Sequence, residues 1–525
     1  MKTAELLVRC LQAEGVDHVF GIPGEENLEV MDAIHQAGMR FVLTRHEQAA
    51  AFMAGTVGRL TGRPGVCLST LGPGATNLVS GVADAYLSNL PMIALVSQAG
   101  EARRNPPQKQ VLDLVAMFRP LAKKVLDVNN PQELPATVRR AFALAGRERT
   151  GPVVLQLPED IMKRESPGEA LDPVPPRRMR SVPTSITQIR RLLERSEKPL
   201  AIIGHGVLRE NAVVEVREFL ASWGIPAGCT WMASGALPYD HPLSLGTIGM
   251  RNSDLAKEAY DEADLVALIG YDATEFQPQY WNRGREKTVV YMGRGGPGKA
   301  RELKVSASAE GDLVHTLGKL IPKGAKAQEW YASHQGTMRR ATETPSSGPK
   351  GLVQALRRQM GRQDIVVSDV GAHLIWLAKF YPAYEPNTLL LQNGLIPMGV
   401  AVPSAIAARM LHPERRVVAV AGDGGFLMSS SELETAKRLG VNFVTVIFND
   451  GGLGLIREKM MRGLGRASNV DLGFPDIPTY ARSFDAEGYS VHEKEFEAVL
   501  KDCLSRNALA VIDVKVDYSH NCDLF

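Results

Sequence analysis

Short apolar runs alternate with longer amphipathic stretches along most of the chain. The runs at 417–421 and 443–448 are rich in β-branched residues, and each ends at a glycine-rich turn. Such runs are typical of buried strands, and the stretch between them has the apolar spacing of a helix. The pattern therefore predicts a βαβ unit, whose two parallel strands present their carboxyl ends at the same edge of a sheet.

The predicted helix between these strands carries suitable residues at both ends. Ser429 and Ser430 can cap its amino end, and Glu432 and Glu434 favour its first turn. Gly440 can end it, because glycine readily adopts the left-handed conformation that closes a helix. The sequence therefore predicts one helix between the two strands.

The same alternation extends over the whole chain and predicts an α/β protein. Two polar stretches, at 166–183 and 323–351, interrupt the alternation and are interpreted as linkers. We therefore predict three domains, each a parallel sheet flanked by helices, at 1–165, 186–325 and 345–525. The length of 525 residues fits this number, at roughly 150 residues for each domain.

The composition is that of a globular protein with a large core, since 44% of the residues are hydrophobic and 22% are charged. A net charge of +2 gives no indication of nucleic acid or a membrane surface as a partner. No run of 18 apolar residues predicts a membrane span. The cysteines have no CxxC spacing, which favours a cytoplasmic location over a disulfide framework or a zinc site: Cys10, Cys67, Cys229, Cys503 and Cys522.

Asp423 and Asp450 each follow one of the two strands predicted at 417–421 and 443–448. Because these strands are parallel, the two carboxylates are expected at the same edge of the sheet. Carboxylate oxygens suit Mg²⁺, and the glycine N–H groups beside them can approach the oxygens of a phosphorylated ligand. Either turn alone would be an ordinary strand end, but the pair favours a binding site.

The sequences GDGG at 422–425 and FND at 448–450, with 27 positions from Asp423 to Asp450, resemble the motif of the thiamine diphosphate (ThDP) enzymes. The resemblance implies that Asp423, Asp450 and the backbone carbonyl of Gly452 bind Mg²⁺. The cofactor contacts that it implies in and around the motif are Asp423, Gly424, Gly425, Asn449, Gly452, Leu453 and Gly454.

Glu47 lies in the sequence RHEQAA, between a predicted strand and an alanine-rich helix. Alone, it would be interpreted as a first-turn carboxylate that the helix dipole favours. The ThDP enzymes need one carboxylate facing N1′ of the aminopyrimidine, and RHEQAAAFMA resembles their pattern. The resemblance therefore implies that Glu47 binds the cofactor and is the catalytic proton relay.

Three further stretches resemble loops of the same family. GIPG at 21–24 and STLGPGATN at 69–77 are similar to its pyrimidine-side loops, and DVGAH at 369–373 is similar to its diphosphate-side loop. Each is also an ordinary glycine turn that leads into a helix, and this interpretation does not compete with the first. The cofactor contacts that these stretches imply are Pro23, Gly24, Thr70, Pro73, Asn77, Gly371 and His373.

The stretch NGLIPMG at 393–399 resembles the segment that shapes the bound cofactor in this family. The resemblance implies that the carbonyl of Ile396 meets the 4′-amino group and that Met398 bends the cofactor. A methionine in an apolar run is more often a core residue, so this role for Met398 depends on the resemblance. Gln110 matches a catalytic glutamine that contacts substrate in acetolactate synthase-like members.

Nearly the whole chain resembles the ThDP family, and most closely its acetolactate synthase-like branch (large catalytic subunit). The resemblance implies decarboxylation of a 2-oxo acid, with pyruvate as the expected donor, and carboligation to an acceptor carbonyl. A simple decarboxylase is the alternative, weakened by the lack of a His-His pair. A non-catalytic ThDP-fold subunit is a third interpretation. The resemblance also implies a homodimer or homotetramer, with ThDP at the subunit interface.

Three departures from the family pattern limit these expectations. Leu453 stands where the branch usually has an aromatic residue, and Pro397 is unusual in its loop. At 291–300, Arg294 and several glycines replace the acidic strand end of members that bind FAD. The sequence therefore argues against FAD in the central domain and leaves ADP open. Arg457 is one of several cations that could bind a 2-oxo acid, although most are expected to be solvated surface.

Overall fold

A computed structural model describes residues 1–104, 108–174, 181–250, 253–284, 286–322 and 329–518. Cys522 and parts of both predicted linkers, 175–180 and 323–328, lie outside the described residues. The chain divides into two compact units, each built from separate segments. The first unit comprises Met1–Arg177, Gly394–His412 and Ser429–Val441, and the second comprises Arg178–Asn393, Pro413–Met428 and Asn442–Phe525. The three domain boundaries expected from the sequence remain predictions.

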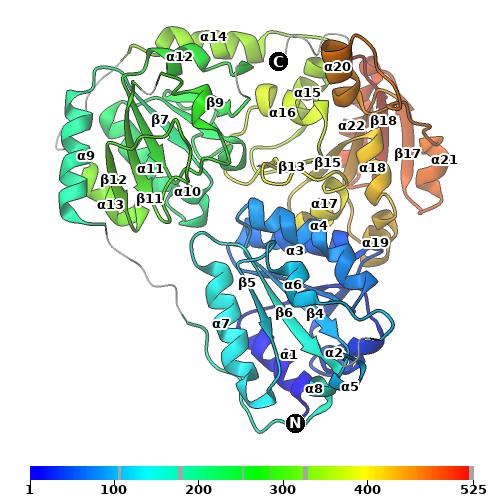
Figure 1. The fold of residues 1–525 in the computed structure, drawn as a ribbon. Coiled ribbons are helices and arrows are strands. Elements are labelled where there is room, and N and C mark those ends of the chain that lie inside the picture. The colour runs from blue at the N-terminus through cyan, green and yellow to red at the C-terminus, as the bar shows by residue number, and fades with distance from the viewer. Residues whose placement is uncertain (105–107, 175–180, 251–252, 285, 323–328, 519–525) are drawn as a thin grey trace. The chain divides into compact units, whose positions relative to one another are not determined.

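Three six-stranded sheets form the framework, and every strand pairing within them is parallel. Helices flank each sheet, as Figure 1 shows. The central strands are apolar on both faces, because helices cover both faces of a parallel sheet. The predicted fold class, an α/β protein with three helix-flanked parallel sheets, is confirmed.

The first sheet has the strand order β2-β1-β3-β4-β6-β5. Its strands are β1 (His18–Gly21), β2 (Arg40–Leu43), β3 (Gly65–Ser69), β4 (Met92–Gln98), β5 (Lys124–Asp127) and β6 (Pro152–Pro158). The helices of this part are α1 (Thr3–Ala13), α2 (Leu28–Gln36), α3 (Glu47–Thr61), α4 (Pro73–Leu87), α5 (Glu101–Arg104), α6 (Leu114–Phe118), α7 (Leu134–Gly146) and α8 (Glu159–Lys163).

The central sheet has the order β12-β11-β10-β7-β8-β9. Its strands are β7 (Pro199–Ile203), β8 (Ala227–Thr230), β9 (Ser244–Ile248), β10 (Leu265–Ile269), β11 (Thr288–Gly293) and β12 (Ala307–Glu310). The helices here are α9 (Pro183–Arg195), α10 (Gly206–Arg209), α11 (Val213–Trp223), α12 (Lys257–Glu262), α13 (Leu313–Leu320) and α14 (Ala332–Glu343). The polar stretch 323–351 therefore contains a helix, which buries only His334, Met338 and Thr342 along one edge.

The third sheet has the order β14-β13-β15-β16-β18-β17. Its strands are β13 (Ile365–Ser368), β14 (Leu389–Leu390), β15 (Val417–Gly422), β16 (Val444–Asn449), β17 (Glu487–Val491) and β18 (Ala510–Lys515). The helices are α15 (Gly348–Gln359), α16 (Ala372–Phe380), α17 (Ala401–Leu411), α18 (Asp423–Ser429), α19 (Glu432–Leu439), α20 (Gly454–Leu464), α21 (Ile477–Arg482) and α22 (Glu493–Ser505).

The βαβ unit predicted from the opening pattern is present, with β15 and β16 paired in parallel, but its connection contains two helices. The glycine-rich segment after β15 is the first turn of α18, because the Asp423 carboxylate accepts the N–H of Gly424 at 2.9 Å. Ser429 ends α18 and does not cap the next helix, whose N-cap is Ser431 without a side-chain hydrogen bond. Gly440, at φ +65°, ends α19 as predicted.

Helices α17 and α19 belong to the first unit, although the sequence places them among elements of the third sheet. Helix α17 packs against α3, and both contribute buried alanines to that contact region, so their backbones can approach closely. None of the helices in the described ranges is both long and apolar enough to cross a bilayer.

Candidate active site

The residues predicted to form the site divide between the two units. In the first sheet, the segments around Gly24 and Thr70 follow β1 and β3. In the third sheet, the segments around His373 and Asp423 follow β13 and β15. Both positions are points where the strand order reverses, and such points form crevices at the carboxyl ends of parallel strands. The topology therefore offers one ligand crevice in each of these sheets.

Glu47 is the first residue of α3 and is only 6% exposed. Its Oε2 accepts a hydrogen bond of 2.9 Å from Nδ2 of Asn77, another predicted residue, which lies in the first turns of α4. The Oε1 atom lies beside Gly74, where a β-carbon would come within 3.1 Å of it. The carboxylate is thus buried, oriented by the hydrogen bond from Asn77 and packed against the first turn of α4 at Gly74.

The turn that leads into α3 is held from a distant part of the sequence. Oε1 of Glu432, at the start of α19, accepts the N–H groups of Arg45 and His46 at 2.9 and 3.1 Å. The ring of His46 in turn accepts the N–H of Gln48 and caps the helix. Glu432, expected only to favour its own helix, therefore helps to position the turn before Glu47.

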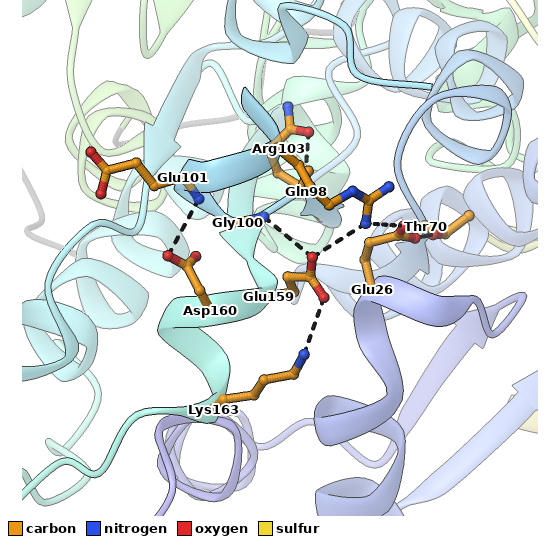
Figure 2. A network of polar contacts seen from close by, with 10 residues as sticks. Glu26, Thr70, Gln98, Gly100, Glu101, Arg103, Glu159, Asp160 and Lys163 are labelled. Atoms are coloured by element: carbon orange, nitrogen blue, oxygen red, sulfur yellow. Dashed lines mark hydrogen bonds and ion pairs between the residues drawn. The ribbon is translucent and has the colours of Figure 1, made fainter. Parts of the chain in front are cut away.

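Thr70 belongs to a network of polar contacts at the carboxyl ends of β3, β4 and β6 (Figure 2). Its hydroxyl donates to Oε2 of Glu26 at 2.6 Å, and Nη1 of Arg103 lies 3.0 Å from Oε1 of the same carboxylate. The same nitrogen of Arg103 lies 3.3 Å from Oε1 of Glu159, which also pairs with Lys163. Sequence analysis did not identify Glu26, Arg103 or Glu159.

The other predicted residues of this loop region have backbone roles. Pro73 is the first residue of α4, where its fixed φ suits a helix start, and Pro23 is exposed in the turn after β1. Gly24 allows a close approach, since a β-carbon there would lie 2.4 Å from Cβ of Thr70. Gly24 and Thr70 are therefore brought into contact, as expected for two loops of one crevice.

Gln110 is exposed and has φ +67°, a left-handed conformation that costs free energy for a residue with a side chain. Its carbonyl oxygen lies against Gly72, where a β-carbon would come within 2.7 Å. The segment with Gln110 thus lies directly on the loop that also contains Thr70.

Ile396 is the second strained residue among the predicted ones, with φ +57°. Its N–H and that of Leu395 lie near the buried carboxylate of Asp84, close to the end of α4, and favour its charged form as hydrogen-bond donors would. Burial raises the pKa of Asp84 to about 6, and these N–H groups act in the opposite direction. The half-buried Met398 follows in the same segment.

Strain is unevenly distributed in the chain. Among the residues that the structure describes, those at positive φ are glycine, asparagine or aspartate, with two exceptions, Gln110 and Ile396. Such conformations persist only where the surroundings impose them, and they are concentrated at functional sites. Both exceptions are residues to which the sequence assigned a role.

In the second unit, Asp423 is 1% exposed and has one unsatisfied oxygen. Its Oδ1 accepts the N–H of Gly424, whereas Oδ2 is buried without a hydrogen-bond partner among the residues that the structure describes. Burial raises the pKa of this carboxyl group, and nearby N–H groups of Gly424, Gly452 and Gly451 lower it. A buried carboxylate oxygen without a partner costs free energy unless a ligand or cation satisfies it.

Asp450 lies close enough to Asp423 for their charges to interact, as expected from the parallel strands. Burial and the charge of Asp423 raise the pKa of Asp450 to about 6, while Arg457 lowers it. Nη1 of Arg457 lies 2.9 Å from Asp450 and Nη2 lies 3.0 Å from Asp471. Arg457 is therefore engaged with carboxylates of its own chain.

The segment after β16 is built for close backbone packing. A β-carbon at Gly454 would lie 2.2 Å from Oδ2 of Asp450, and one at Gly452 would lie 2.3 Å from the carbonyl oxygen of Val470. Leu453 donates its N–H to the same carbonyl at 2.8 Å and precedes α20. These glycines bring the backbone against Asp450.

Both polar ends of the buried Asn449 side chain have partners. Its Nδ2 donates to Asp513 at 2.8 Å, and its Oδ1 accepts the N–H of Gly451 at 3.0 Å. In the structure, Asn449 thus fixes the turn that positions Asp450.

His373 is buried at the start of α16, next to the crevice that Asp423 also borders. Burial lowers the pKa of His373 to about 4, so the ring is neutral near pH 7. Its Nε2 is buried and has no hydrogen-bond partner within the described part of the chain. A β-carbon at Gly371 would lie 2.8 Å from Cε1 of this ring, and one at Gly425 would lie 3.0 Å from Oδ1 of Asp369.

These features fit a cation and a phosphorylated ligand. Two interacting carboxylates with an unsatisfied oxygen suit a divalent cation, and a buried imidazole nitrogen without a partner suits a phosphate oxygen. Within the described ranges, no group of three or more His, Cys, Asp or Glu side chains could hold a metal. Further oxygen ligands would therefore come from backbone carbonyls, such as that of Gly452, or from the phosphorylated ligand itself.

Comparison of the sequence with known proteins identifies its family. Three family models match the chain: the N-terminal TPP binding domain of the thiamine pyrophosphate enzymes at 1–117, their central domain at 186–318, and their C-terminal TPP binding domain at 369–514. The chain is also 33% identical to an acetolactate synthase of Bacillus subtilis, over 99% of this chain and 94% of the relative. The chain belongs to the thiamine pyrophosphate enzyme family.

Other relatives within this family carry related names. A probable acetolactate synthase large subunit of Methanocaldococcus jannaschii is 32% identical over 98% of this chain and 92% of its own length. A catabolic acetolactate synthase of Raoultella terrigena is 31% identical over 99% of this chain and 95% of its own length. Membership in the thiamine pyrophosphate enzyme family implies ThDP as cofactor, and it confirms the resemblance to acetolactate synthases.

The central sheet also has a point where the strand order reverses, between β7 and β10. There the carboxylate of Glu275 accepts the N–H of His205, whose nitrogen lies 3.0 and 3.2 Å from the two carboxylate oxygens. Arg294, which follows β11, pairs with Glu210 and Asp312, each at 3.1 Å. These polar groups at the edge of the central sheet are thus engaged with one another, and the expectation that FAD is absent from the central domain stays a prediction.

Sequence analysis missed the residues that support the site from a distance. Asp84, Glu275 and Arg103 are single charged residues without a motif around them, and their partners are far away in the sequence. Tyr518, whose hydroxyl is buried and whose pKa is raised by burial and by Asp450 and Asp423, is a further example. No local motif shows which residues lie near these positions, and only the order of the strands could have indicated it.

Proposed function

We propose that this protein is a ThDP- and Mg²⁺-dependent enzyme that decarboxylates pyruvate and joins the remaining two-carbon unit to a second 2-oxo acid, as an acetolactate synthase does. The observation that carries the proposal is Asp423, a buried carboxylate with an unsatisfied oxygen beside a second carboxylate at a sheet edge. The resemblance of the relatives named acetolactate synthase, over nearly their whole length, supports the choice of reaction.

The proposed roles follow from the contacts of each residue. Asp423, Asp450 and the carbonyl of Gly452 would hold Mg²⁺, and His373 with the backbone at Gly371, Gly424 and Gly425 would face the diphosphate. A neutral His373 can donate Nε2–H to a phosphate oxygen without adding charge. The remaining contacts, proposed from the resemblance, are Asn449, Leu453 and Gly454.

In the first unit, the buried Glu47 would accept and return a proton at N1′ of the aminopyrimidine, held in orientation by Asn77. The Ile396 carbonyl would face the 4′-amino group, with Met398 beneath the cofactor and Pro23, Gly24, Thr70 and Pro73 around it. Bound ThDP would supply the carbanion chemistry that removes CO₂ from a 2-oxo acid. Gln110 would contact the substrate.

The thiamine pyrophosphate enzyme family usually forms dimers, and we propose a homodimer or homotetramer in which the cofactor lies at a subunit interface. A cytoplasmic location agrees with the four described cysteines, which are all unpaired thiols.

The decisive experiment incubates purified protein with pyruvate, ThDP and Mg²⁺ and follows products by NMR. We expect CO₂ and acetolactate, in a ratio of one to one, because two pyruvate ions and a proton give one of each. Acetaldehyde as the main product would identify a simple decarboxylase. No turnover of pyruvate or of larger 2-oxo acids, despite ThDP binding, would contradict the proposal.

Glu47→Gln provides the sharpest single-residue test. The amide cannot relay a proton, so we expect turnover to fall by about 10²–10⁴-fold while ThDP affinity stays within a fewfold. Asn77 can still donate to the carbonyl oxygen of the glutamine side chain, so we expect the variant to fold. Turnover like that of the wild type would remove Glu47 from the mechanism.

A further inference from the structure

The loop with Thr70 and the segment with Gln110 are joined in a closed ring of contacts. Thr70 donates to Glu26, and Glu26 pairs with Arg103 (Figure 2). The carbonyl of Arg103 accepts the N–H of Gln108 at 3.1 Å. The ring closes where the carbonyl of Gln110 lies against Gly72, two positions after Thr70.

Arg103 is the member of the ring that links separate elements. A single nitrogen, Nη1, lies within 3.3 Å of carboxylates from the turn after β1 and from the start of α8, Glu26 and Glu159. Glu26 is only 7% exposed, so this guanidinium and the Thr70 hydroxyl replace most of the contact with water that its carboxyl group loses. Glu159 has a second cation, Lys163 at 3.1 Å, and depends less on Arg103.

Residues 108–112 have further contacts that hold them in place. Nε2 of Gln98 donates to the carbonyl of Leu112 at 3.0 Å, and the N–H of Val111 donates to the carbonyl of Gln108 at 3.1 Å. Between these contacts, Gln110 is held at φ +67° with its side chain exposed. The direction of the Gln110 side chain is therefore set by the surrounding backbone, since a strained conformation persists only where neighbours impose it.

We propose that Arg103 and Glu26 are positioning residues that hold residues 108–112 against the loop at 70–74, and so aim the Gln110 side chain at the substrate. The claim that Gln110 is aimed at the substrate rests on the proposed function, whereas the claim that residues 108–112 are held against the loop does not. Through Thr70, the same ion pair ties the substrate-contacting segment to the loop that faces the cofactor, so that both keep one relative position.

The test uses backbone amide hydrogen exchange of the full-length protein without cofactor. In Arg103→Met we expect the amides of 108–112 to exchange at least about fivefold faster, because one of the contacts that hold this segment to the unit is lost. Lys163→Met is the matched control: it removes a cation from the same Glu159 but touches neither Glu26 nor the segment. Exchange at 108–112 should be unchanged in this control.

A second pair of variants separates positioning from simple charge compensation. If Arg103 only neutralises a buried carboxylate, Glu26→Gln should restore wild-type exchange in the Arg103→Met background. If Arg103 positions the segment, the double variant should exchange as fast as Arg103→Met alone. Unchanged exchange in Arg103→Met, or full restoration in the double variant, would overturn the proposal. If Arg103→Met does not fold, Arg103→Lys and Glu26→Gln carry the same comparison.

Kinetics provide the readout for the substrate. Misplacement of a contacting group by about 1 Å can cost up to about 100-fold, so we expect kcat/KM for pyruvate to fall about 10–100-fold in Arg103→Met. The loss should lie mainly in KM, ThDP affinity should stay within about twofold, and Arg103→Lys should recover part of the loss. Faster exchange with unchanged kcat/KM would leave the holding contact in place and remove its role for substrate. Absence of turnover in the wild type would instead contradict the proposed function.

Discussion

Two sheet edges in the second unit can be compared directly, because both are the carboxyl ends of parallel strands at a reversal of strand order. At the central sheet, the Glu275 carboxylate accepts the N–H of His205 and the hydroxyl of Thr230. At the third sheet, an oxygen of Asp423 and Nε2 of His373 are buried without a hydrogen-bond partner among the described residues. The same topology thus holds one carboxylate, Glu275, that is satisfied by its own chain, and another, Asp423, that is left with an oxygen for a ligand.

The comparison indicates what makes a strand-end crevice a binding site. Topology supplies the crevice in both places, and both contain carboxyl groups whose pKa is raised by burial, to about 7 for Glu275 and about 6 for Asp450. The difference lies in whether the chain provides its own hydrogen-bond donors for those oxygens. A raised pKa alone therefore does not identify the site, whereas the unsatisfied oxygen of Asp423 beside a second carboxylate distinguishes this edge.

The largest effect is expected at the edge that needs a ligand. Asp423→Ala removes a proposed metal oxygen, and we expect Mg²⁺-dependent ThDP retention to weaken by at least roughly 100-fold, because even groups that only support a metal ligand cost about 10–100-fold. Equilibrium dialysis with ThDP at several Mg²⁺ concentrations measures this. Glu275→Ala is the matched control, a buried carboxylate removed from the other edge. Equal losses in both variants would mean that the effect is general destabilisation.

A smaller, pH-dependent effect is expected at the central edge. The pKa of Glu275 is raised to about 7, so the folded state holds a proton that the unfolded state loses near pH 4.5. Stability contributed by the neutral form is therefore lost as pH rises from about 4.5 through about 7. Glu275→Gln is always neutral, so its unfolding midpoint should fall less between pH 5 and pH 8 than that of the wild type. Parallel curves for both proteins would contradict this assignment.

The smallest effect is expected when nucleotides are offered to the central edge. The N–H of His205 already donates to Glu275, so we expect FAD and ADP at micromolar concentration to leave the unfolding midpoint unchanged. ThDP with Mg²⁺ should raise the midpoint. A differential scanning measurement with each ligand suffices. A clear upward shift with FAD would show that the central edge opens, and the contrast between the two edges would fail.

The sequence was most informative where residues with a special role are close together. Asp423 and Asp450 lie on two consecutive strands, and their meeting follows from parallel pairing alone. Glu47 and Asn77 were each identified by motif, and the structure joins them by a hydrogen bond. The predicted α/β architecture rests on the same local patterns, which is why it could be read from one sequence.

Other features depend on contacts that no local pattern records. Glu275 and His205 are 70 positions apart, and Arg103 and Glu26 are 77 apart, each as single charged or polar residues in ordinary surroundings. Helix α14 was interpreted as part of a linker because only three of its residues are buried. The glycine-rich start of α18 was interpreted as a turn because glycine usually disfavours helix, and the close approach of Gly425 to Asp369, which leaves no room for a side chain, is a tertiary contact that the local pattern does not record.

Gln110 and Ile396, the two described residues at positive φ that are not glycine, asparagine or aspartate, have a consequence for protein engineering. Glycine adopts this conformation without strain, so a search for thermostable variants would tend to select glycine at both positions. The gain would come at the two places where a fixed side chain or carbonyl serves the proposed reaction. Selection for heat resistance and selection for turnover should therefore diverge here first, which makes these positions a local example of the trade-off between stability and activity.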